Sequence, residues 1–161
     1  MYSVMSASTD RPELLPLVFA AVDHAIESVA HSGGPLIAFA LVAEGDQVTL
    51  HRFVDETLEG GVERAREFLR EADANVTFVA LAYDGYLTCD GVRTDAIYVA
   101  AQEAGKHNSD LFAQPYAMTD DGLAEIGNVK HVEINEPTLL GVAAEPAKAG
   151  KKVFGRFRLA R

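Results

Sequence analysis

Apolar residues recur every three or four positions in two stretches of the chain, which is the spacing of an amphipathic helix. The first stretch covers residues 10–31, with Asp10 placed to cap the helix and Ser32-Gly33-Gly34 placed to end it. The second is LEGGVERAREFLREADAN, residues 58–75, where apolar residues follow one side and charged residues the other. We therefore expect two helices, each with one face buried.

Elsewhere the pattern changes to short apolar runs and to alternation, which is typical of strands. PLIAFALVAEGDQVTLHRFV predicts a hairpin, because two apolar runs, Leu36–Val42 and Val48–Phe53, flank the turn residues Glu44-Gly45-Asp46. Pro115 cannot donate a backbone hydrogen bond, so we expect its strand at a sheet edge or with a bulge. Further strands are expected at Val76–Tyr83, Asp95–Gln102, Leu111–Met118, Asn128–Asn135 and Val153–Leu159.

The order of these elements predicts an α+β fold in a single domain that spans residues 1–161. Strands that follow one another through short turns favour an antiparallel sheet, here of about six or seven strands. The two helices must cover apolar strand faces, and we expect them to pack mainly on one face of the sheet.

Charge is distributed unevenly along the chain. Residues 145–161 contain six of the 14 basic residues and one acidic residue, a net charge of +5, whereas the other 144 residues carry −15. In this segment VFGRFRL alternates, with Phe154, Arg156 and Arg158 on one side of a half-buried strand. We expect this basic C-terminal strand to dock on the acidic body or on a second copy of the chain, with these three residues at the interface.

Composition favours a cytoplasmic protein without a cofactor. The single cysteine, Cys89, cannot form an intramolecular disulfide, and the first residues lack the basic start and apolar middle of a secretion signal. No run approaches the ~18 consecutive apolar residues of a membrane helix. The net charge of −10 argues against nonspecific nucleic-acid binding by the whole body, which leaves the basic segment as the place for such contact.

The stretch YDGYLTCDGVRTDAIYV, which starts at Tyr83, holds the most side chains with reactive groups. Asp84-Gly85 and Asp90-Gly91 are both dipeptides that favour turns. Cys89 is expected to pack as a small residue, because no nearby histidine is present in the sequence to hold it as a thiolate. Asp84 and Asp95 are placed to face each other across a hairpin, either as an acid–base pair or cation site or as ordinary turn residues.

Four polar residues on neighbouring predicted strands are the candidates for a ligand pocket. Tyr98 and Gln102 share one face of their strand, and Gln114 and Tyr116 share one face of the next. If these faces coincide, the four side chains project together into a pocket rimmed by the two aspartates named above. If they do not, the tyrosines belong to the core.

The histidines lack the spacing of a zinc motif. His131 and Glu133 share a strand face, and His51, Asp55 and Glu56 are close in sequence, but neither group supplies a full set of ligands. We therefore expect no metal site.

The favoured function is a non-catalytic binding or interaction module that acts as a homodimer, because the chain combines an acidic body with a basic last strand and shows no catalytic set. One alternative is a small-molecule-binding protein or enzyme with a pocket around Tyr98 and Tyr116. A second alternative is nucleic-acid contact through residues 145–161.

Overall fold

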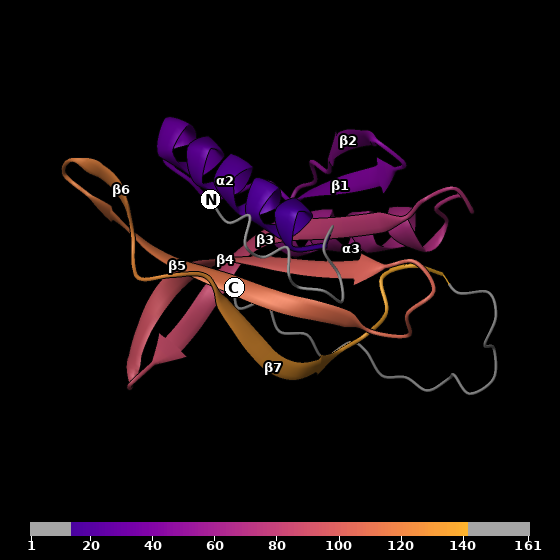
Figure 1. Cartoon of the computed structure of the whole chain (residues 1–161). Helices are drawn as coiled ribbons and strands as arrows, with labels where there is room; N and C mark the ends of the chain where they lie inside the picture. The colour runs from indigo at the N-terminus through magenta and orange to yellow at the C-terminus, as the bar shows by residue number, and fades with distance from the viewer. Residues whose placement is uncertain (1–13, 142–161) are drawn as a thin grey trace.

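The computed structural model describes residues 14–141, without the side chains of residues 133–136, and shows two helices and seven strands (Figure 1). All strand pairs are antiparallel, so the expected α+β class and antiparallel sheet are confirmed. In chain order the elements are α2 (Leu14–Ser32), β1 (Phe39–Glu44), β2 (Gln47–Arg52), α3 (Leu58–Arg70), β3 (Phe78–Cys89), β4 (Val92–Glu103), β5 (Ser109–Thr119), β6 (Gly122–Glu125) and β7 (Lys130–Glu136).

The strands are ordered β2-β1-β3-β4-β5-β6, and β7 also pairs with β5 (Figure 1). One edge of β5 therefore has two partners, with β6 along its C-terminal half and β7 along its N-terminal half. Pro115 lies where the partner changes, between Ala113 in the β7 register and Tyr116 in the β6 register. Its missing N–H costs little there, so the proline is tolerated in a strand that is not at the sheet edge. The strand's irregularity lies instead between Ser109 and Leu111.

The two helices pack on opposite faces of the sheet, which corrects the expectation that both lie mainly on one face. Phe39 and Leu41 of β1 belong to the core beneath α2, whereas Ala40 and Val42 belong to the core beneath α3. Successive side chains of a strand point to opposite faces, so the two cores lie on either side of β1. A strand that is apolar on both faces is typical of a sheet covered on both sides.

Helix α2 lies across its face of the sheet with its apolar stripe inward (Figure 1). By length and composition it is the one described helix that is also able to cross a membrane. Its stripe is buried against the strands, as in the core helix of a soluble protein. The buried residues of the stripe are Leu14, Leu17, Val18, Ala21, Val22, Ala25 and Val29.

The β3–β4 hairpin is continuous over the full length of both strands. Asp90 and Gly91 make its two-residue turn with positive φ angles of 54° and 79°, as a type I′ turn requires. Asp84 and Gly85 lie inside β3, so the turn predicted at this dipeptide was wrong. The residues before and after the dipeptide pair continuously with β4, and this pairing outweighs the local preference of the dipeptide for a turn.

Candidate functional site

The register between β4 and β5 separates the predicted ligand residues onto two faces. Tyr98 lies opposite Ala113, whereas Tyr116 lies opposite Asp95. Positions 95 and 98 of β4 are an odd number apart, so the two tyrosines project from opposite faces. Tyr98 packs on the α3 side and Tyr116 on the α2 side. The single pocket expected around both tyrosines does not form.

Gln102, on the α3 side, is buried and holds the segment that follows β7. Its side-chain oxygen accepts hydrogen bonds from the backbone N–H groups of Leu139 and Leu140. Its amide nitrogen donates to the carbonyl of Lys106 and to the hydroxyl of Thr138. These contacts satisfy the amide inside the protein, so Gln102 has a structural role.

Gln114 and Tyr98 are also engaged in contacts within the fold. The amide nitrogen of Gln114, which is 1 % exposed, donates to the carbonyls of Pro115 and Gly127 at 2.9 and 3.2 Å. The Tyr98 hydroxyl donates to the carbonyl of Tyr86 at 2.6 Å. Burial raises the pKa of Tyr98, and the nearby cysteine thiol adds to this rise.

Strands β4 and β5 separate beyond the pair formed by Asp95 and Tyr116, which is the last in their register. Beyond this pair, the β3–β4 and β5–β6 hairpins point away from each other (Figure 1). A pocket of about 260 Å³ lies where they part. We call this cavity the junction pocket. The polar side chains that line it are Asp84, Tyr86, Asp95 and Tyr116.

Asp84 and Tyr116 are the buried members of the junction pocket, with 9 % and 4 % of their surfaces exposed. One carboxylate oxygen accepts a hydrogen bond from the backbone N–H of Leu36 at 2.8 Å, and both oxygens lie 3.1–3.2 Å from the Tyr116 hydroxyl. Burial raises the pKa of the Asp84 carboxyl, although these hydrogen bonds oppose the rise. Burial and the neighbouring Asp84 charge also raise the pKa of Tyr116.

The other side of the junction pocket is open to solvent. Asp95 is exposed and lies opposite Tyr86 in the β3–β4 hairpin. Tyr86 and Asp84 are two residues apart on β3, so Asp84 and Asp95 are diagonal neighbours on the same face of the sheet. The guanidinium carbon of Arg93 lies 3.9 Å from the centre of the Tyr86 ring. The pocket therefore combines two carboxyl groups with tyrosine rings, one of which already contacts a cation.

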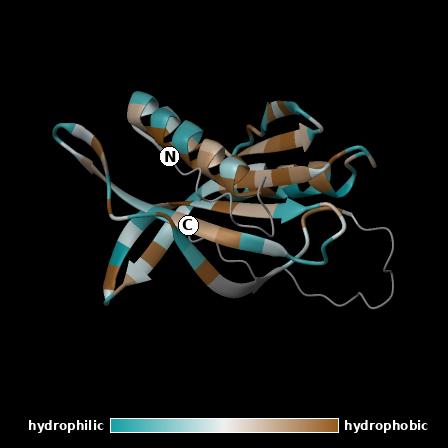
Figure 2. Ribbon diagram, in the orientation of Figure 1, coloured by the Kyte–Doolittle hydropathy of each residue, from teal (hydrophilic) through white to brown (hydrophobic). Residues whose placement is uncertain are grey.

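The second candidate surface is the outer edge of β2, which sequence reasoning did not single out. Among the described strands, β2 pairs with β1 alone. Val48 is 54 % exposed and Leu50 is 36 % exposed. Both project to the α2 side, since they lie opposite Ala43 and Leu41. The alternation of QVTLHR marks the strand (Figure 2), but its place at the sheet edge follows only from the strand order.

A groove of about 780 Å³ runs between α2 and the β1–β2 hairpin. Its lining includes Ile37 of the connection after α2, Phe39 of β1 and Arg52 of β2. Val48 and Leu50 are not among the residues that line this groove, but they are exposed on the same face of the sheet.

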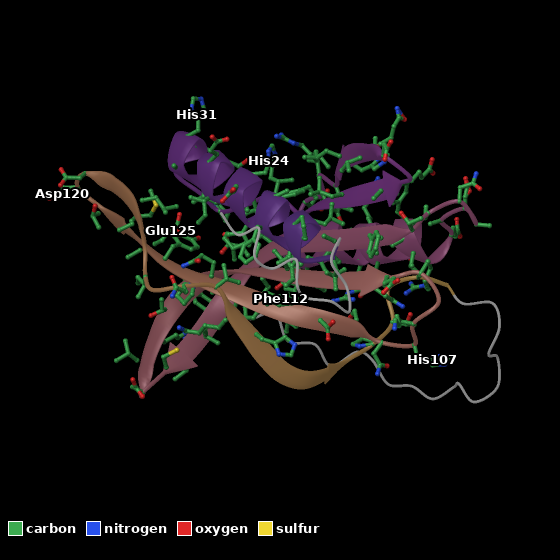
Figure 3. The ribbon with its side chains drawn as sticks, viewed as in Figure 1. His24, His31, His107, Phe112, Asp120 and Glu125 are labelled. Carbon is green, nitrogen blue, oxygen red and sulfur yellow. The ribbon has the colours of Figure 1, made fainter. Side chains whose placement is uncertain are left out.

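The histidines lie apart from one another in the described structure. His24 lies on α2 (Figure 3), and His51 packs against a phenylalanine of α3. His131 lies with its Nε2 atom 3.7 Å from an oxygen of Asp110, and the side chain of Glu133 lies outside the described part of the structure. Over residues 14–141, no three His, Cys, Asp or Glu side chains are placed to hold a metal ion.

Cys89 is half-buried at the end of β3, beside the tip of the hairpin. The predicted interface residues Phe154, Arg156 and Arg158, with the rest of residues 145–161, lie outside the described residues.

The sequence matches no protein-family model, and comparison with curated proteins and with solved structures found no significant match.

Proposed function

We propose that the chain is a cytoplasmic, non-catalytic binding module that forms a homodimer through the free edge of β2. The observation that carries this proposal is a six-residue strand, Gln47–Arg52, whose outer edge has no partner among the described strands. Its exposed Val48 and Leu50 present an apolar row beside that edge.

An unpaired strand offers a row of backbone N–H and C=O groups that another strand can complete. Soluble proteins commonly block such an edge with proline, lysine or a bulge. None of these occurs in QVTLHR, and its β-branched Val48 and Thr49 favour strand pairing. A second copy supplies an identical strand, so edge-to-edge pairing joins two sheets and covers both apolar rows.

Sedimentation of the full chain at micromolar concentration tests this proposal. We expect a reversible dimer of twice the 17.3 kDa chain mass. A species that remains monomeric throughout the concentration series contradicts it. A full-length variant with Arg156→Glu and Arg158→Glu tests the competing interface in the basic C-terminal segment. We expect this variant to dimerise as the wild type does. Loss of the dimer would show that the interface lies in the basic C-terminal segment instead.

The junction pocket supports a second candidate function, the binding of a small organic cation. Asp84 and Asp95 supply negative charge, and Tyr86 and Tyr116 supply ring faces. The guanidinium of Arg93 over the Tyr86 ring supports this candidate, because it is a cation–π contact at one of the pocket's rings. The pocket volume of about 260 Å³ suits only a small molecule.

Titration of the full chain with tetramethylammonium chloride, followed by NMR, tests the second function. Saturable shifts at Tyr86 and Tyr116 are expected, and Asp95→Asn should weaken them. Sodium chloride at equal ionic strength is the control. Shifts that are equal for the two salts contradict cation binding.

A further inference from the structure

We infer that the two copies pair through β2 in one particular register, antiparallel about a two-fold axis that passes through Thr49. This inference rests on the proposed homodimer and adds the residues that select the partner strand. The structural basis is the arrangement of Val48, Leu50 and Arg52, which project to the α2 side of the sheet. The turn residue Asp46 directly precedes the strand and lies as many residues before Thr49 as Arg52 lies after it.

The symmetry follows from strand geometry. Residues directly opposite each other in an antiparallel pair project from the same face. A two-fold axis perpendicular to the sheet at Thr49 therefore places Val48 of one copy opposite Leu50 of the second copy. It also places Asp46 of one copy opposite Arg52 of the second copy. Each contact occurs twice, which gives two apolar pairs and two pairs of opposite charge.

Neighbouring registers that keep the faces aligned lose these matches. An axis through Leu50 places Val48 opposite Arg52 and leaves Asp46 opposite Val54. An axis through Val48 places Asp46 opposite Leu50. Both alternatives set a charged side chain against an apolar one, whereas cross-strand pairs of like character or opposite charge stabilise a sheet.

Asp46 and Arg52 are available for these contacts. Both side chains are exposed, and neither forms an ion pair with another residue of the described range 14–141. Asp46 directly precedes β2, and Arg52 is its last residue, so the two charges bracket the apolar row. An uncharged or like-charged edge strand lacks this match, which makes the second copy the preferred partner.

Two charge reversals in the full chain test the register by sedimentation. Asp46→Lys places two positive charges opposite each other in each symmetric pair, and Arg52→Glu places two negative charges there. We expect each variant alone to weaken the dimer by about tenfold or more. A mixture of the two variants restores opposite charge at both positions, so it should form a heterodimer with affinity close to that of the wild type.

The mixture separates the register from loss of folding, since a misfolded variant is not rescued by another. A dimeric wild type whose affinity is unaffected by both reversals, or whose weakened variants are not rescued by mixing, overturns the register and leaves the proposed homodimer standing. A monomeric wild type contradicts the homodimer itself.

Discussion

The Tyr116 hydroxyl on β5 bonds the buried Asp84 carboxylate on β3, with 3.1 and 3.2 Å between the oxygen atoms. Strand β4 lies between these two strands, so the contact spans three strands of the sheet. The same carboxylate also receives the Leu36 N–H from the connection between α2 and β1. Asp84 thus links the connection after α2 to strands β3 and β5, at the base of both projecting hairpins.

Asp84→Asn should destabilise the protein by about 1–3 kcal/mol, because one amide oxygen replaces two carboxylate oxygens facing two donors. Chemical denaturation measures this loss. Asp95→Asn is the matched control, since Asp95 lines the same pocket but is exposed, and it should change the stability by less than about 0.5 kcal/mol. Equal losses in the two variants would show that the buried contacts of Asp84 do not stabilise the fold.

The raised pKa of Asp84 predicts a defined dependence of stability on pH. The folded protein holds this proton more tightly than the unfolded chain, whose carboxyl has its ordinary pKa of 3.8. The stability from this group is therefore complete below pH 3.8 and is lost as pH rises through the raised pKa. The difference in unfolding free energy between wild type and Asp84→Asn should grow as pH falls from neutral toward 3.8. A difference that shrinks over that range contradicts the raised pKa.

Gln102→Leu should release the segment after β7, because the backbone N–H groups of Leu139 and Leu140 lose their acceptor while remaining buried. We expect a loss of about 2–3 kcal/mol in unfolding free energy. Hydrogen exchange of these two amides gives the local measurement, and both should exchange faster in the variant. Unchanged protection at both amides would show that Gln102 does not hold this segment.

Val48→Lys should weaken the dimer, because a charged side chain then interrupts the apolar row beside the free edge. Val92→Lys is the matched control: Val92 is 61 % exposed on β4, at the far hairpin, and is unrelated to the edge of β2. Sedimentation of the two variants at equal concentration should show more monomer for Val48→Lys alone. Equal dissociation of both variants would point to a general effect of charge.

The elements themselves were largely predictable, because helix and strand periods are local properties of the chain. The long stripe of α2 and the alternation of β2 are both visible in the sequence. The short β6 was not predicted, since GLAE offers too few residues for a pattern. The turn predicted at Asp84-Gly85 was wrong, because the residues before and after this dipeptide pair with β4, which outweighs its own preference for a turn.

The candidate sites depend on register and strand order, which the sequence leaves open. A shift of one residue between β4 and β5 decides whether Tyr98 and Tyr116 share a face, and they do not. Tyr116 instead meets Asp84 across an intervening strand, a contact that no local pattern indicates. The exposed edge of β2 likewise follows from its terminal place in the sheet order.

Disulfide formation in a Thr49→Cys, Cys89→Ser variant tests the homodimer through β2 most directly. The axis through Thr49 places both copies of this residue opposite each other, at a Cα separation of roughly 4.5–5.5 Å that suits a disulfide. Val92→Cys in the same Cys89→Ser background is the control. The proposed dimer predicts rapid, nearly complete cross-linking at Thr49→Cys under mild oxidation and little in the control. Free thiol at Thr49→Cys, or equal cross-linking of both variants, would contradict a homodimer joined at this edge in the register about Thr49.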